Sequence, residues 1–166
     1  MMTQGWNKDQ HSFAQYYGSD TVDASSLLLM ITNFTGTKEP RMLSTIDRIQ
    51  KELASGALVR RYNPKTAAND GFTSQEGTFG ACSFWFIEVL ARAGRLDEAR
   101  LLLEKLLSYS NHVGLYAEEI SPMGEALGNF PQAFTHLALI TACTALDQAL
   151  DRHQGRPWKT SGMLYR

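Results

Sequence analysis

The sequence is poor in the residues that form disulfides or bind metal ions in small proteins. It has only two cysteines and four histidines among 166 residues. Cys82 and Cys143 both lie in apolar segments with helical spacing, so we expect small core residues rather than a disulfide. There is no Cys-x-x-Cys pair, and the histidines lack ligand spacing. The sequence therefore predicts neither a metal site nor a cofactor.

An excess of one charge and a long apolar run are also missing. Sixteen Lys and Arg residues oppose seventeen Asp and Glu residues, and the net charge of −1 does not favour nucleic acid binding. No stretch approaches about 20 uninterrupted apolar residues, the length that crosses a bilayer. The N-terminus has no apolar signal region. We expect a single globular domain over residues 1–166, located in the cytoplasm.

Two kinds of helix alternate along the chain. Segments 24–34, 76–93 and 131–150 are apolar on nearly every face, whereas 41–55 and 95–109 carry one apolar stripe opposite charged residues. A helix that is apolar all round must be surrounded by protein, and a striped helix lies outside. The sequence therefore predicts an all-α fold with inner and outer helices. Five helices do not close a ring, so we expect an arc of an α/α toroid.

Capping and turn residues mark several helix ends. Asp23 can cap the first helix, and Pro40 suits the first turn of the second. Gly56 is predicted to be the C-cap of that second helix, and Gly94 ends the third. From about residue 151 the chain is polar and basic, so we expect a loosely ordered tail.

Two long loops interrupt the helical pattern, at 58–74 and 111–129. Each leads from an outer helix into an inner one, so both are expected on the same side of the arc. Long aperiodic loops in compact domains are often functional. The second loop places Glu118 and Glu119 side by side, just before the most continuously apolar segment of the chain. This carboxylate pair is the first candidate for chemistry.

Three segments resemble a known family. DGFTSQEGTFGACSFWFIEVLARAGRLDEA, GLYAEEISP and LGNFPQAFTHLALI are similar to glycoside hydrolase family 15, which contains the glucoamylases and, in bacteria, glucoamylase-like proteins and trehalases. The resemblance runs from about Trp6 to Leu150 and covers the C-terminal part of the family's catalytic domain. It implies an (α/α)6 barrel, of which this chain is an incomplete arc. It also implies inverting hydrolysis of α-glucosidic bonds.

The resemblance further implies roles for individual residues. Glu118 falls on the position of the general base, with Glu119 supporting it. The residues matching the family's sugar site are Arg61, Tyr62, Glu76 and Trp85. An inverting enzyme also needs a general acid, with its carboxyl group roughly 6.5–9.5 Å from the base. In the family that acid precedes the segment beginning at Trp6 and no residue here matches it, so we expect the isolated chain to be inactive.

Several of these residues also have structural interpretations. Thr73 to Glu76 form a capping box, in which Glu76 bonds back to the Thr73 backbone. Trp85 suits the core of so apolar a helix, and His136 is expected to be a buried histidine with satisfied ring nitrogens. Asn129 and Gln132 together predict the start of a helix.

A different class of function is the alternative. The helix pair around Gly94 resembles a hairpin of tetratricopeptide arrays, which would make the chain a non-catalytic helical-repeat interaction protein. No second copy occurs at a period near 34 residues, and this alternative gives the loop at 111–129 no role.

The partners follow from the arc and the resemblance. An isolated arc would leave inner-helix faces such as Leu27–Ile31 uncovered. We therefore expect self-association or association with the missing N-terminal part of the enzyme. The expected substrate is an oligosaccharide or disaccharide, with neither nucleic acid nor membrane as a partner.

Overall fold

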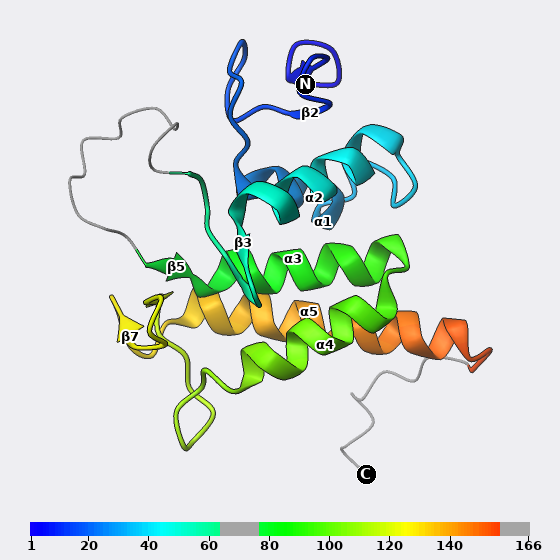
Figure 1. The fold of residues 1–166 in the computed structure, drawn as a ribbon. Helices are drawn as coiled ribbons and strands as arrows, with labels where there is room; N and C mark the ends of the chain where they lie inside the picture. The colour runs from blue at the N-terminus through cyan, green and yellow to red at the C-terminus, as the bar shows by residue number, and fades with distance from the viewer. Residues whose placement is uncertain (64–76, 157–166) are drawn as a thin grey trace.

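A computed structural model describes residues 1–63 and 77–156, and helices are its main regular structure (Figure 1). The helices are η1, a 3-10 turn at Ala24–Leu27, then α1 Leu28–Ile31, α2 Pro40–Leu53, α3 Gly80–Ala93, α4 Leu96–Leu107 and α5 Ala133–His153. Two-residue antiparallel strands join them, namely β1 Trp6–Asn7, β2 Ser12–Phe13, β3 Ala54–Ser55, β4 Leu58–Val59, β5 Thr78–Phe79, β6 Glu119–Ile120 and β7 Ala126–Leu127.

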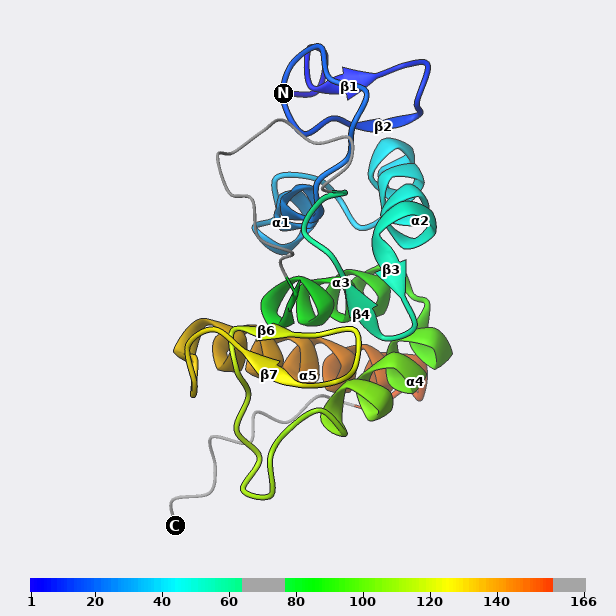
Figure 2. The same ribbon diagram turned by 60° about the vertical axis from the view of Figure 1, so that its left-hand side comes forward.

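The helices form two rows (Figure 2). Helices α1, α3 and α5 lie on one side, and α2 and α4 lie on the other. Helix α3 is central and packs against η1 and all four of the other α-helices. Helices α3 and α5 run in the same direction and pack directly on each other, and α4, which connects them along the chain, runs in the opposite direction (Figure 1). The helices predicted to be inner and those predicted to be outer therefore fall into two separate rows.

The core is built around α3, where Phe84, Phe86 and Leu90 are fully or almost fully buried. The predicted stripe of α2 also faces inward, as buried Met42, Ile46, Ile49 and Leu53 show. Cys82 lies in this core. Burial, and to a lesser extent the nearby carboxylate of Asp23, raises the pKa of its thiol to about 12. Cys82 is thus a small core residue, as expected.

The helix ends confirm some predictions and correct others. Pro40 is the first residue of α2, and Gly94 ends α3 in the left-handed conformation. The predicted role of Gly56 as a helix C-cap is wrong. Gly56, at φ +64°, instead forms the turn of the β3–β4 hairpin, because α2 has already ended at Leu53. The first helix is also shorter than predicted, since α1 ends at Ile31.

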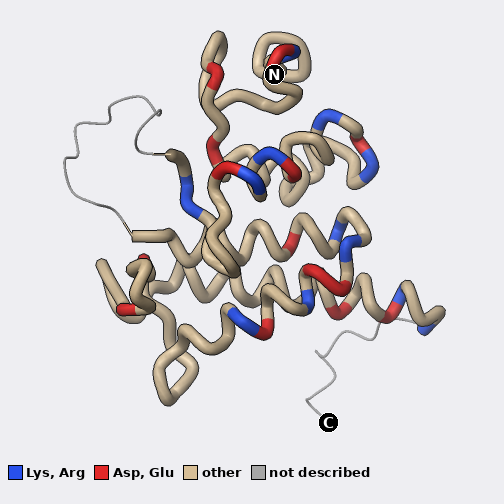
Figure 3. The backbone as a smooth tube through the Cα atoms, viewed as in Figure 1, with Lys and Arg blue, Asp and Glu red and all other residues tan. Residues whose placement is uncertain are grey.

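A run of exposed apolar side chains lies on α5, and the prediction that Leu27–Ile31 are uncovered is wrong. Leu27 and Met30 are fully buried, whereas Leu137 and Ile140 on α5 are 60% and 59% exposed. The patch continues through Phe130 and Phe134, and Figure 3 shows that this part of α5 carries no charged residue.

The prediction that α5 is surrounded by protein therefore holds for one face only. Its buried face, with Ala138, Ala142 and Leu146, packs on α3, and no described residue covers the opposite face. By length and composition alone α5 could also cross a membrane, a criterion that core helices of soluble proteins meet as well.

Replacing Leu137 and Ile140 together by Gln is expected to weaken self-association of the chain. The two side chains form the centre of the exposed patch, and large exposed apolar patches drive association. Sedimentation velocity should show a concentration-dependent increase in size for the unmodified chain and little increase for the double variant. Leu101→Gln is the control, because Leu101 is 53% exposed on α4, outside the patch. A chain that stays monomeric at all concentrations would contradict this prediction.

Candidate active site

The loop predicted at 111–129 is an ordered hairpin attached to the start of α3. Its central strand β6 pairs with β5 through Phe79 and Glu119, and with β7 through Glu119 and Leu127. Helix α3 begins directly after β5, and α5 begins shortly after β7. The three-stranded sheet therefore joins the N-terminal ends of two inner helices (Figures 1 and 2).

Glu118 is held from both its main chain and its side chain. Its carbonyl oxygen accepts the N–H of Gly80 at 3.0 Å, and its own N–H donates to the carbonyl oxygen of Asn129 at 2.9 Å. Its Oε2 atom accepts two more hydrogen bonds from Asn129, one from the backbone N–H at 3.1 Å and one from Nδ2 at 2.9 Å. The carboxylate is thus fixed through one oxygen and is half-buried.

Glu119 binds a different part of the sheet. Its Oε2 atom accepts the backbone N–H of Gly77 at 2.7 Å. Neighbouring side chains on an extended strand point to opposite faces, so Glu118 contacts the approach to α5 while Glu119 contacts the approach to α3. The two carboxylates are therefore held by hydrogen bonds from different parts of the sheet.

Gly128 permits the close approach of Glu118. It has φ +71°, and a Cβ atom at this position would lie 2.8 Å from Oε2 of Glu118. Any side chain here would push the carboxylate away from the two donors of Asn129. Gly128 is therefore part of the site, although the sequence pattern gave it no role.

Gly128→Ala is expected to destabilise the chain by about 1–3 kcal/mol, because left-handed strain and the contact with Glu118 add together. Gly114→Ala is the matched control, since Gly114 has φ +81° with open space around it. Urea unfolding of both variants separates the two effects. Equal losses in the two variants would show that Gly128 is needed only for its backbone conformation.

The hairpin rests on a small cluster beneath it. Tyr116 is buried, and its ring meets Phe84 edge to face at 5.3 Å. The Nε2 atom of His136 accepts the N–H of Tyr116 at 3.3 Å, and Nδ1 lies 2.7 Å from the carbonyl oxygen of Gln132. Both ring nitrogens of His136 have partners, as predicted, but the residue is half-buried and not buried.

Arg61 and Tyr62 lie at the same end of α3 but beside the first helix. Nε of Arg61 is 3.7 Å from Oδ2 of Asp23, and the guanidinium lies over the Tyr62 ring at 5.6 Å. Asp23 is almost fully buried and also caps η1 by accepting the N–H of Ser25. Its predicted capping role is confirmed, and its pairing with Arg61 was not foreseen.

Of the other two predicted sugar-site residues, Trp85 lies in the described part of the chain. Trp85 is half-buried, and its ring meets Phe134 edge to face at 5.6 Å, between α3 and α5. Glu76, with the capping box that begins at Thr73, lies outside the described residues. The described ends of both long loops nevertheless lie at one end of α3, as expected (Figure 1).

The arrangement provides an anchored carboxylate, a second carboxylate and a guanidinium at one end of the inner helices. Within residues 1–63 and 77–156, no group of three His, Cys, Asp or Glu side chains is placed to hold a metal ion. The functional groups present suit proton transfer and hydrogen bonding to hydroxyl groups.

Comparisons with known proteins identify relatives of this chain. Residues 1–144 match glycosyl hydrolases family 15. A trehalase of Thermoplasma volcanium is 43% identical over 152 residues, which are 90% of this chain and 24% of the relative. A trehalase of Mycolicibacterium smegmatis is 48% identical over 129 residues, 77% of this chain and 19% of the relative. The chain thus spans a quarter or less of the curated relatives it matches.

Solved glycosidase structures share the fold. One wild-type glycosidase superimposes with a TM-score of 0.73 at 18% identity, over 87% of this chain and 40% of the other. A glycosidase variant in complex with glucose gives 0.72 at 17% identity with the same coverage. Identity this low is informative about the fold alone. The match to the family, in contrast, is a match of sequence and covers most of the chain. This match over residues 1–144 establishes that the chain belongs to glycosyl hydrolases family 15.

Proposed function

We propose that this chain is the C-terminal, base-carrying segment of a family 15 glucosidase that hydrolyses trehalose with inversion. The observation that supports this most is the carboxylate of Glu118, which Asn129 anchors through Oε2 alone. A general base must be oriented by neighbouring groups and still have an oxygen available for the proton that it accepts. Oε1 of Glu118 is that oxygen, since no residue in 1–63 or 77–156 forms a hydrogen bond with it.

In the proposed reaction, Glu118 removes a proton from a water molecule that attacks the anomeric carbon. The bond from that carbon to the glycosidic oxygen breaks, and a general acid protonates the departing oxygen. Water attacks from the face opposite the leaving group, so the configuration inverts. The acid is supplied from outside this chain, by the part of a family-length enzyme that precedes it.

The remaining site residues are proposed to bind the sugar. Arg61 and Glu119 present a charged donor and a charged acceptor to hydroxyl groups, and Tyr62 and Trp85 offer ring faces and edges. Glu76 completes the set from the sequence resemblance. The closed (α/α)6 barrel, with this chain as one globular part of it, belongs to the same proposal.

Trehalose is chosen from the relatives. Both relatives above carry the name trehalase and match most of this chain. Starch-like oligosaccharides are the competing substrates for this family. The family match favours a glycosidase over the helical-repeat alternative, and the ordered hairpin carrying Glu118 and Glu119 agrees with that choice.

A chimera provides the test, because the chain alone is expected to lack the acid. The trehalase of Thermoplasma acidophilum matches this chain at 44% identity over 151 residues, about a quarter of its length. Replacing that matched segment by this chain should yield an enzyme that releases glucose from trehalose faster than from maltose or maltotriose. A soluble chimera that hydrolyses maltose but not trehalose would contradict the substrate, and one inactive on all three would contradict the function.

A further inference from the structure

The two carboxylate oxygens of Asp23 have different partners. Oδ1 accepts the N–H of Ser25 at 2.7 Å, which is the cap of η1. Oδ2 lies 3.3 Å from Nε2 of Gln15 and 3.7 Å from Nε of Arg61. A helix cap requires one acceptor oxygen, and an asparagine or serine supplies it about as well as an aspartate. The cap therefore accounts for Oδ1, but neither for Oδ2 nor for the negative charge.

The negative charge of Asp23 matches the positive charge of Arg61. The Asp23 side chain is only 4% exposed, and a buried charge is costly unless it is paired. Within residues 1–63 and 77–156, Arg61 provides the only basic nitrogen within 4 Å of this carboxylate. Their separation of 3.7 Å exceeds the usual N–H···O hydrogen-bond length of about 2.7–3.2 Å. The two residues thus form an ion pair that acts through charge.

The backbone places Arg61 beside Asp23 independently of this ion pair. The N–H of Ala24 donates to the carbonyl oxygen of Arg61 at 2.7 Å. Asp23 itself forms an antiparallel bridge with Tyr62. A substitution that removes only the charge of Asp23 should therefore leave the main chain of Arg61 in place and change only the direction of its guanidinium group.

Arg61 stays accessible while it is paired. Nε is its nitrogen nearest to Asp23, and 54% of its side chain is exposed. The guanidinium also lies over the Tyr62 ring, 5.6 Å from the ring centroid. The carboxylate and the ring together restrict a long side chain that would otherwise have many rotamers. A side chain that is oriented beforehand loses less conformational entropy when it binds a ligand.

We propose that Asp23 is a positioning residue, which orients the guanidinium of Arg61 for binding to the hydroxyl groups of the sugar. This inference rests on the proposed function, in which Arg61 is a sugar ligand. Gln15 supports the same arrangement, because its Oε1 atom accepts the hydroxyl of Thr21 at 3.0 Å and its Nε2 atom is thereby directed to Asp23. Asp23 acts through Arg61 and makes no contact with the sugar.

Kinetics of the chimera with the Thermoplasma acidophilum trehalase test this proposal. Asp23→Asn keeps the cap and should raise KM for trehalose about tenfold, with kcat changed less than about twofold, because binding through a charged donor is weakened. Arg61→Gln should raise KM at least as much. Adding Asp23→Asn to Arg61→Gln should have no further effect, since the two residues act as one unit. Effects that multiply in the double variant would overturn the proposal.

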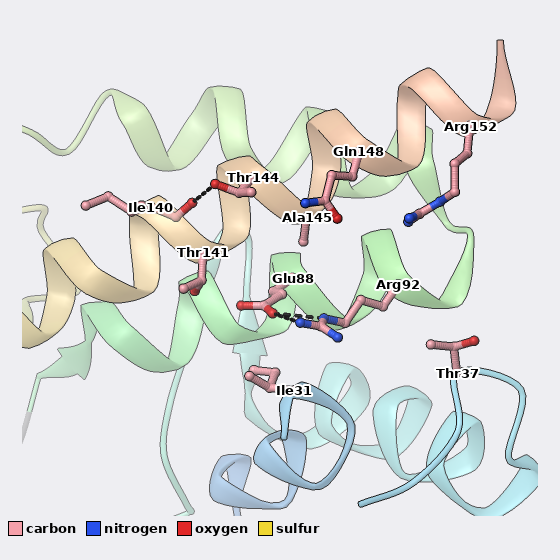
Figure 4. A pocket seen from close by; sticks show the side chains of 10 residues that line it. All are labelled: Ile31, Thr37, Glu88, Arg92, Ile140, Thr141, Thr144, Ala145, Gln148 and Arg152. Atoms are coloured by element: carbon pink, nitrogen blue, oxygen red, sulfur yellow. Dashed lines mark hydrogen bonds and ion pairs between the residues drawn. The ribbon is translucent and has the colours of Figure 1, made fainter. Parts of the chain in front are cut away.

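Glu88→Gln controls for the loss of a buried ion pair elsewhere in the fold. The Glu88 side chain is 2% exposed and pairs with Arg92 at 2.7 Å. Figure 4 shows this pair on α3, where it lines a cavity of about 670 Å³ together with residues of α1 and α5. Glu88 follows Gly80, the first residue of α3, by about 12 Å along the helix, at about 1.5 Å per residue. KM should stay unchanged in this variant, and a rise equal to that of Asp23→Asn would overturn the proposal.

A measurement on the full 166-residue chain separates this inference from the proposed function. Relaxation of the ¹⁵Nε–H group should show that Arg61 is more restricted than Arg100, whose pair with Glu104 is exposed on both sides. Asp23→Asn should remove the difference. Equal mobility of the two arginines in the unmodified chain would overturn the positioning role, whether or not the variant folds. A chimera inactive on every sugar would overturn the proposed function, and the relaxation data would still decide whether Asp23 orients Arg61.

Discussion

Replacing Glu118 by Gln is expected to lower kcat for trehalose hydrolysis by the chimera about 10²- to 10⁴-fold, the range of general acid–base catalysis. Glutamine keeps the shape of the side chain and can still accept the hydrogen bonds of Asn129 at one atom. It cannot take a proton from water. Because the lost proton transfer to Glu118 stabilises the transition state and not the bound substrate, KM should change little. Glucose release at several trehalose concentrations measures both constants.

Glu119→Gln is the matched comparison, because the neighbouring carboxylate binds the N–H of Gly77 on the other face of the strand. We expect it to reduce kcat less than Glu118→Gln, and to raise KM if Glu119 contacts the sugar. A larger loss of kcat for Glu119→Gln, with Glu118→Gln nearly unaffected, would move the general base by one residue. Circular dichroism of both variants verifies that the fold is retained.

Phe84→Ala is expected to lower the free energy of unfolding by about 3–5 kcal/mol, the usual cost of emptying a fully buried aromatic position. Phe84 has no exposed surface, and it packs edge to face against Tyr116. Such a loss is a large part of the stability of a domain this size. Urea unfolding followed by circular dichroism measures it.

Leu101→Ala is the stability control, since Leu101 is 53% exposed on α4, and its loss should stay within about 0.5 kcal/mol. Phe84→Ala should also accelerate hydrogen exchange at Tyr116 and Ile120, because the hairpin loses its support. An unchanged exchange rate at these residues, despite the loss of stability, would show that the sheet pairing alone holds the hairpin in place.

The helical part of the fold was predictable because its signals are local. Periodicity distinguishes the striped α2 and α4 from the apolar α3, and Pro40 and Gly94 mark ends that the structure confirms. The strands were not predicted, since two residues are too few to show an alternating pattern. Gly56 was misassigned for a related reason: a glycine after a helix suits both a C-cap and a hairpin turn.

The most informative contacts of the site are long-range and leave no pattern in the sequence. Asn129 was interpreted as part of a helix start, yet α5 begins only at Ala133 and Asn129 binds Glu118 instead. Asp23 was recognised as a cap, but its second partner, Arg61, lies far along the chain. The exposed face of α5 was missed because composition reports how apolar a helix is and not what covers it.

The shared direction of α3 and α5 has an electrostatic consequence. Each helix carries about half a positive elementary charge at its N-terminus, and the hairpin brings both N-termini to the end where Glu118 and Glu119 lie. These macrodipoles favour the two carboxylates, but in the proposed reaction they would oppose the positive charge that develops on the glucosyl ring during bond cleavage. In that reaction the negative charges of both glutamates would have to exceed the positive field of the two helix N-termini. Loss of either glutamate would leave this field partly uncompensated at the glucosyl ring.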